Sequence, residues 1–240
     1  MAIRRVSSLE ELDLPNKYIY QGNNGYIYNF KDKYFKVLDE EYMSLDNRKN
    51  QGRLDILGKL SELENTKYLV LPEDIYVTDS KILGYTMRIC PGKEFIYLDD
   101  DVSYDKLVLG IINLLFDIEI LSNNGLLDLD ICSSNIFFDG VNLYLLDFDG
   151  TISFDDKRKA YLLMGMSLIN LCIGKIMDSD RLEWFKDIDI DYMWEKMNRL
   201  ESSNYIGLLW LIKLKRSRVL GKDVETLGDI RRVLRRLSIK

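Results

Sequence analysis

The sequence contains no histidine in its 240 residues. Catalysis by a Ser-His-Asp or Cys-His arrangement is therefore excluded, and so are zinc sites that need imidazole ligands. Any acid–base or metal chemistry has to rest on carboxylates, amides and lysines. A reactive site is consequently expected in the aspartate-rich middle of the chain.

Cysteine is also scarce. Cys90, Cys132 and Cys172 are odd in number, widely spaced and without a Cys-x-x-Cys pair. This pattern argues against a disulfide framework or a zinc site, and it suits a reducing cytoplasm. The N-terminus lacks the apolar segment of a secretory signal, and no apolar run approaches the roughly 18 residues that span a bilayer. We therefore expect a cytoplasmic protein without a transmembrane segment.

Positive charge is concentrated at the C-terminus. The net charge is −6, yet residues 213–240 contain ten Lys and Arg against three acidic residues. Such a basic segment is suited to contact an acidic partner. The alternative is a solvated helix face, because the arginines alternate with apolar residues at helical spacing: Ile230, Val233, Leu234 and Leu237.

The first third of the chain predicts a small β-rich unit. Short alternating runs broken by turn signals predict strands over 17–21, 25–30, 33–38, 73–79 and 82–89. Leucines at helical spacing predict one helix over 53–64. Cys90-Pro91-Gly92 interrupts the pattern. We therefore place a domain boundary here, with a small lobe at 1–90 and a larger lobe at 91–240.

The larger part is predicted to be mainly helical. A long apolar helix over 104–125 ends at an Asn-Asn-Gly stop. Strands at 135–138 and 143–146 flank Asp139-Gly140, which is a strong hairpin signal. From Ala160 onward the pattern is almost wholly helical. The fold class predicted from these elements is α+β.

The hairpin brings polar residues together. Asp130 and Asn135 are separated by four residues in the loop that enters it, and Asp147 follows its second strand. Adjacent strands lie about 4.8 Å apart, so Asn135 and Asp147 are expected at one rim. A carboxylate and an amide oxygen suit Mg²⁺, which takes few protein ligands. Asp130 is then placed to accept the proton of an attacking hydroxyl.

Residues 125–150, GLLDLDICSSNIFFDGVNLYLLDFDG, resemble the catalytic loop and magnesium segment of the protein-kinase-like superfamily, H-x-D-x-x-x-x-N followed by a hairpin and D-F-G. The resemblance implies a two-lobed kinase-like fold that binds ATP and Mg²⁺. It assigns the proton acceptor to Asp130 and the magnesium ligands to Asn135 and Asp147.

The first lobe contains further pieces that resemble this family in the same order. QGNNGYIYNF resembles a reduced glycine-rich loop, with Gly22 and Gly25 permitting backbone approach to phosphate. YFKVL resembles the strand that carries the phosphate-binding lysine, here Lys36. GYTMRICPG resembles the last strand and hinge, which implies Met87 as gatekeeper and the backbone of Arg88 to Cys90 facing adenine.

Several positions depart from the family pattern. Asp128 stands where the family usually has histidine, Cys132 where protein kinases have a lysine, and Asp149 where D-F-G has glycine. The helical glutamate that pairs with the lysine is not evident. Asp55, which lies 19 residues after Lys36, is the best candidate for that partner.

The segment after Asp147 is short. Only nine residues separate Asp147 from the helix expected near Lys157, and no A-P-E follows. There is no room for a long activation segment. The resemblance therefore implies an ATP- and Mg²⁺-dependent phosphotransferase whose hydroxyl acceptor is a protein Ser or Thr or a small molecule.

Two alternatives compete with this interpretation. LLDFDGTI also fits the first motif of haloacid-dehalogenase-type phosphatases, with Asp147 as nucleophile and Asp149 as acid–base. That motif normally opens a domain of alternating strands and helices, whereas here the rest of the chain is predicted to be helical. The second alternative is a catalytically weak kinase-like protein that acts as an interaction module.

Overall fold

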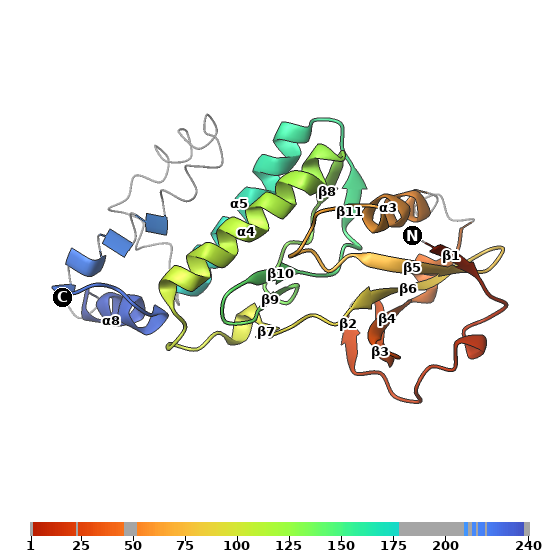
Figure 1. Ribbon diagram of the computed structural model, residues 1–240, viewed down its shortest axis with the longest axis horizontal. Helices are drawn as coiled ribbons and strands as arrows, with labels where there is room; N and C mark the ends of the chain where they lie inside the picture. The colour runs from red at the N-terminus through yellow and green to blue at the C-terminus, as the bar shows by residue number, and fades with distance from the viewer. Residues whose placement is uncertain are drawn as a thin grey trace.

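The computed structural model describes residues 2–22, 24–45, 52–177, 209–210, 213–214, 216–218 and 220–237. A mixed six-stranded sheet lies at one end of the molecule, and a pair of long helices lies beside it (Figure 1). A small antiparallel sheet stands between the two parts in Figure 1. The predicted α+β class is confirmed.

The large sheet has the order β1-β5-β6-β4-β3-β2. Its strands are β1 (Ala2–Arg5), β2 (Tyr20–Gly22), β3 (Gly25–Phe30), β4 (Lys33–Leu38), β5 (Pro72–Val77) and β6 (Ile82–Arg88). Five of them match the predicted strands. β1 was not predicted, and it adds to the edge of the sheet by pairing in parallel with β5.

One face of the large sheet is covered by α3 (Arg53–Ser61). Leu57 and Leu60 of this helix are buried, as are Phe35, Ile75 and Tyr85 of the sheet. The predicted leucine stripe is therefore the packing face of the helix, which ends slightly earlier than predicted. Two short segments complete this part: η1 (Glu10–Leu12) and α1 (Glu40–Met43).

The predicted hairpin is confirmed as β9 (Ile136–Phe138) and β10 (Leu143–Leu145), joined by β7 (Lys93–Glu94) in a three-stranded sheet. Asp139 closes the turn, because its Oδ1 accepts hydrogen bonds from the backbone of Val141 and Asn142 at 2.8 and 2.7 Å. The hairpin is also tied to the segment that leads into β5, since the Val70 amide donates to the Leu145 carbonyl at 2.8 Å.

A second strand pair lies next to the hairpin. β8 (Leu126–Asp128) and β11 (Thr151–Ser153) are antiparallel, with Asp128 opposite Thr151. This pairing brings the loop after β8 beside the segment after β10. Neither of these three-residue strands was predicted.

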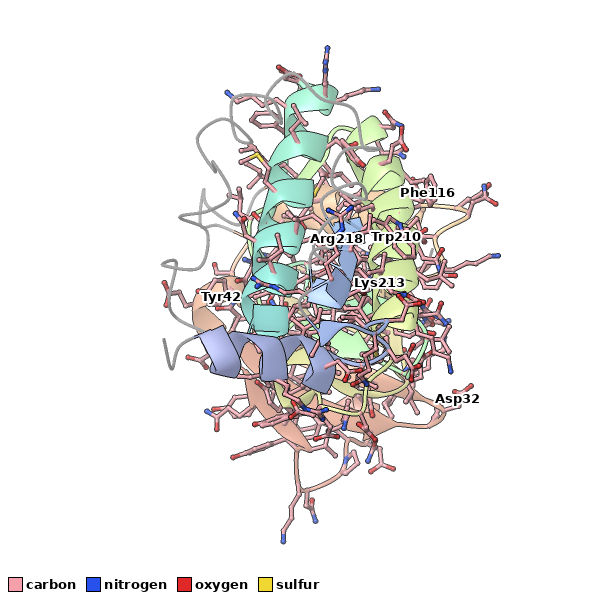
Figure 2. All side chains as sticks on the ribbon, turned by 90° about the vertical axis from the view of Figure 1, so that its left-hand side faces the viewer. Asp32, Tyr42, Phe116, Trp210, Lys213 and Arg218 are labelled. Atoms are coloured by element: carbon pink, nitrogen blue, oxygen red, sulfur yellow. The ribbon has the colours of Figure 1, made fainter. Side chains whose placement is uncertain are left out.

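The helical part is built on α4 (Tyr104–Asn123) and α5 (Lys157–Met177), which run side by side (Figures 1 and 2). Ser103 caps α4 by accepting from the Lys106 amide. By length and composition alone, residues 157–176 of α5 could span a membrane. One face of α5 is in the core, however, as in an interior helix of a water-soluble protein: Ala160, Met164, Leu168, Ile169, Cys172, Ile173 and Ile176 are buried.

The C-terminal helix α8 (Leu227–Leu237) lies across one end of the α4–α5 pair (Figure 2). Its Arg231 is buried, contacts Asp100 and donates to the Lys175 carbonyl at 3.1 Å. Trp210 and Lys213 lie beside α4, where Lys213 pairs with Asp105 at 2.6 Å (Figure 2). The described positions therefore confirm helices at both ends of the predicted helical region, whereas residues 178–208 lie outside the described part.

Candidate functional site

A cleft of about 210 Å³ lies between the large sheet and the hairpin. It is lined by the predicted residues Lys36, Met87, Cys90, Asn135 and Asp147 together with Ile19, Tyr20, Ile27, Tyr34, Tyr85, Gly92, Glu94, Ser134, Phe137 and Leu146. The fold thus brings five predicted site residues to one cavity. Burial raises the pKa of the Cys90 thiol to about 12, so this side chain is a neutral part of the wall.

Lys36 is the buried cation of this cleft. Strand β4 carries it, and the residue is 2 % exposed. Its Nζ lies 2.6 Å from Oδ1 of Asp147 and 2.8 Å from Oδ2 of Asp149. Burial lowers the pKa of the ammonium, but the Asp149 and Asp147 carboxylates raise it by more, so the pKa lies above its ordinary value. Lys36 is therefore charged at neutral pH.

Asp147 sits in a strained turn. Its φ is +60°, a conformation that is uncommon for residues other than glycine and costs free energy. The next residue, Phe148, is buried in the core and anchors the turn, which closes through a 3.1 Å bond from the Thr151 amide to the Phe148 carbonyl. Burial raises the pKa of Asp147, and Lys36 opposes only part of this effect.

Asp149 is the second carboxylate at Lys36. Its side chain is 2 % exposed, and its Oδ1 accepts a 3.3 Å hydrogen bond from the Tyr85 hydroxyl. Burial raises the pKa of Tyr85 well above its ordinary value, and the charge of Asp149 adds to this effect. From the sequence, Asp149 was considered as a departure from glycine and as the acid–base residue of the phosphatase alternative, but not as a partner of Lys36. Its two-residue spacing from Asp147 was the signal that both could face one cation.

Asp130 and Asn135 form the rim of the site. The Asn135 Nδ2 donates to the Asp130 carbonyl at 3.0 Å and to Asp130 Oδ2 at 3.1 Å. The Leu146 amide donates to the Asn135 carbonyl at 2.8 Å, which places Asn135 next to the residue before Asp147. The loop and the strand end therefore meet as the hairpin predicted.

Gly150 allows the turn after Asp147 to approach the loop. A Cβ atom at Gly150 would lie 2.9 Å from the Cβ of Asp130 and 3.3 Å from its backbone nitrogen. The Gly150 carbonyl also accepts a 3.4 Å bond from the Leu129 amide. Asp130 is consequently held by Asn135 on one side and by this turn on the other.

Asp128 lies beneath the rim and is 3 % exposed. Its Oδ1 accepts from the Asp130 amide at 3.3 Å and from Thr151 Oγ1 at 3.4 Å. Its buried Oδ2 has no hydrogen-bond partner among the described residues. Burial, with smaller contributions from the charges of Asp130 and Asp147, raises the pKa of Asp128 to about 7. This carboxyl group therefore connects the loop to β11 without a compensating cation.

Asp55 is not the partner of Lys36, contrary to the prediction. It is exposed in the first turn of α3, whereas Lys36 pairs with Asp147 and Asp149. The physical reason is the leucine stripe: because Leu57 and Leu60 are the buried positions of α3, Asp55 points to the opposite, exposed side of the helix.

The other residues predicted to bind the nucleotide lie in different places. Gly22 and Gly25 pair across the β2–β3 turn, and neither lines the cleft. A Cβ at Gly25 would lie 2.0 Å from the Val37 carbonyl oxygen, so glycine is required for strand packing there. The prediction for Arg88 concerns its backbone; its side chain donates to the Lys67 and Leu69 carbonyls and stacks over the Tyr144 ring.

The donor set at the rim fits a magnesium ion with few protein ligands. Asp147 uses Oδ1 for Lys36, and its Oδ2 makes no hydrogen bond or ion pair within the described residues. Asn135 uses Nδ2 as a donor, which leaves its amide oxygen as the acceptor. The described residues contain no group of three or more His, Cys, Asp or Glu suited to a metal. An ion held by one carboxylate and one amide needs no such group.

A larger depression of about 700 Å³ lies elsewhere, between the start of the chain, β4 and the β5–β6 turn. None of the predicted site residues lines it. Five predicted site residues, among them the buried Lys36, line the smaller cleft instead, so the smaller cleft is the candidate site.

Comparison with known proteins gives no assignment. No protein-family model matches the sequence, and no curated protein matches it at a significant level.

Proposed function

We propose that the chain is an ATP- and Mg²⁺-dependent phosphotransferase with a protein-kinase-like arrangement. Residues 1–90 would be the nucleotide-binding lobe, and residues 91–240 the lobe with the catalytic loop. The observation that carries the proposal is that Lys36, Asn135 and Asp147 line one cleft, with Asp130 hydrogen-bonded to Asn135 at its rim.

The apolar part of the cleft suits the base of a nucleotide. Ile27, Tyr34 and Met87 line it, and Tyr34 stands opposite Met87 in the pairing of β4 with β6. Ligand sites are mostly apolar, with a few polar groups that fix orientation. The buried ammonium of Lys36 lies in the same cleft and would bind the phosphates.

The rim supplies the groups that phosphoryl transfer needs. Asn135 and Asp147 would hold Mg²⁺, which neutralises the charge of the triphosphate when bound. Asp130 would accept the proton of the attacking hydroxyl. Asn135 orients the Asp130 carboxylate through its 3.1 Å hydrogen bond to Oδ2. This chemistry depends mainly on positioning and charge, so few side chains are sufficient.

The phosphatase alternative fits the geometry less well. Asp147 follows β10, which pairs with β9 in an antiparallel hairpin instead of lying inside a parallel sheet. Asp149 would be its acid–base residue, yet its side chain is 2 % exposed and paired with Lys36. These two observations favour the phosphotransferase.

The proposed location is a reducing cytoplasm. All three cysteines are free, and Cys90 and Cys172 are buried. We do not propose an acidic partner for the basic C-terminal segment. Three of its cations, Lys213, Lys222 and Arg231, already pair with aspartates of the chain.

The experiment that tests the proposal is transfer of the labelled γ-phosphate of ATP, with Mg²⁺, to cell-lysate proteins and to small-molecule pools. We expect the wild-type chain to transfer label. Asp130→Asn should slow transfer about 10²- to 10⁴-fold while retaining nucleotide affinity. The matched control is Asp32→Asn, which makes the same change at an exposed turn and should have no effect.

Other outcomes identify the alternatives. Mg-ATP binding without any transfer would indicate an interaction module. Hydrolysis of phosphate esters through an aspartyl-phosphate on Asp147 would indicate the phosphatase. Full activity in Asp130→Asn would show that Asp130 is not the proton acceptor.

A further inference from the structure

We infer that Asp149 is the positioning residue for Lys36, in the role for which the resemblance expects a carboxylate from a helix. This inference rests on the proposed function, because it concerns how the lysine is held for the phosphates of ATP. The structure places the Asp149 carboxylate 2.8 Å from Lys36 Nζ, on the segment that also carries Asp147.

The two carboxylates at Lys36 differ in what else they can do. The side chain of Asp147 is 29 % exposed and its Oδ2 is available to a cation. That of Asp149 is 2 % exposed, and the Tyr85 hydroxyl fixes its other oxygen at 3.3 Å. If Asp147 turns its charge toward Mg²⁺, Asp149 is the carboxylate that stays with the ammonium. A buried cation needs such a partner.

Helix α3 offers no carboxylate for this role. Asp55 is the one acidic residue in Arg53–Ser61, and it is exposed. The start of the helix instead presents a cation, because Arg53 and Asp149 line the same small cavity of about 210 Å³. The Arg53 Nη1 atom is buried there without a hydrogen-bond partner among the described residues. A cation of this helix, and no carboxylate, therefore lines a cavity together with Asp149.

The consequence is that one turn positions both the lysine and the metal ligand. Phe148 lies between Asp147 and Asp149 in sequence and is anchored in the core. A displacement of α3 would therefore not remove the carboxylate from Lys36. In this chain the position of the lysine is coupled to the turn and not to the helix.

The test is calorimetric binding of Mg-ATP to the full chain in a double-mutant cycle of Asp149→Asn and Lys36→Gln. We expect Asp149→Asn to weaken binding about tenfold when Lys36 is present and less than about twofold in the Lys36→Gln background, because contacting residues are coupled. The matched control is Asp55→Asn, which removes the same charge from α3 and should leave affinity within about twofold.

A second comparison separates charge from packing. Asp149→Glu keeps the carboxylate but enlarges the side chain, whereas Asp149→Asn keeps the size but removes the charge. A positioning role predicts tighter Mg-ATP binding by the Glu variant than by the Asn variant. A packing role predicts the reverse, because a buried site tolerates an isosteric change better than an enlarged one.

Tyr85→Phe provides a milder test if the Asp149 variants do not fold. It removes only the hydroxyl bonded to Asp149 and should weaken binding about two- to threefold, again only when Lys36 is present. Equal losses in both Lys36 backgrounds, or a loss in Asp55→Asn, would overturn the inference while leaving the proposed function intact. Absence of Mg-ATP binding by the wild-type chain would overturn both.

Discussion

Lys36 donates a 2.6 Å hydrogen bond to Oδ1 of Asp147, although the two residues are 111 positions apart in the sequence. The contact joins a strand of the large sheet to the segment that follows the hairpin. Each side chain alone has an ordinary structural explanation. Their contact inside a cleft, with Asp149 beside them, places a buried cation at the carboxylate proposed to hold the metal.

The first prediction concerns stability without ligand. Lys36→Ala should lower the free energy of unfolding by about 3–5 kcal/mol, because it leaves the Asp149 carboxylate buried without its cation. Adding Asp149→Asn should restore part of that loss. Urea denaturation measures both, with Lys106→Ala on the exposed face of α4 as the control. A loss below about 1 kcal/mol for Lys36→Ala would contradict the buried pair.

The second prediction is a pH dependence that originates at Asp128. Its pKa is about 7 in the folded chain, against an ordinary value of 3.8. The folded state therefore binds this proton more tightly than the unfolded state does. Asp128 therefore stabilises the folded state most at acid pH, and this contribution is lost as the pH rises toward about 7. The free energy lost is about 1.4 kcal/mol for each unit by which the folded and unfolded pKa values differ.

Asp128→Asn should abolish this dependence, because the amide does not titrate. We expect the melting temperature of the variant, relative to that of the wild type, to increase as the pH is raised from 5 to 8. Asp32→Asn, which changes an exposed aspartate, is the matched control. If the difference in melting temperature between the variant and the wild type is the same from pH 5 to pH 8, the folded state does not hold a proton on Asp128.

The third prediction concerns Asn135 and Asp147 as joint magnesium ligands. Their effects on Mg-ATP affinity should not add, because either loss already disrupts the same metal–nucleotide unit. Asp147→Asn should be the more severe change, since it removes a charge that faces the cation. Asn135→Ala should be partly rescued by Mn²⁺, which such sites bind more tightly. Additive losses in calorimetry would place the metal elsewhere.

The fourth prediction compares two glycines of the β2–β3 turn. Gly25→Ala should destabilise the fold by about 1–3 kcal/mol, because its Cβ would lie 2.0 Å from the Val37 carbonyl oxygen. Gly22→Ala should cost less than about 0.5 kcal/mol, since the nearest atom would be 3.7 Å away. Equal effects in urea denaturation would mean that the turn does not pack against β4 as described.

Local patterns predicted most of the elements, because alternation and helical spacing reflect which side is buried. The leucines of α3 and the hairpin around Asp139-Gly140 are examples, and the hairpin also explains why Asn135 and Asp147 could be placed at one rim. β1 was missed because Ala2–Arg5 has no alternating pattern of its own and depends on a distant parallel partner, β5.

The pairing of Lys36 was predicted less well. Asp55 was chosen by its distance along the chain from Lys36, but the leucine stripe of the same helix already directs it outward. Asp149 was overlooked because its contact with Lys36 depends on how the hairpin packs against the large sheet. The two-residue spacing of Asp147 and Asp149 permits a shared cation, but it does not identify Lys36 as that cation.

Titration of Mg-ATP into the full chain by calorimetry measures the proposed nucleotide binding, with Asp147→Asn and the exposed control Asp32→Asn measured beside the wild type. We expect binding that requires Mg²⁺, is unchanged in the control and weakens about tenfold or more in Asp147→Asn. Absence of heat with the wild type at millimolar nucleotide, or binding that depends on neither Mg²⁺ nor Asp147, would contradict it.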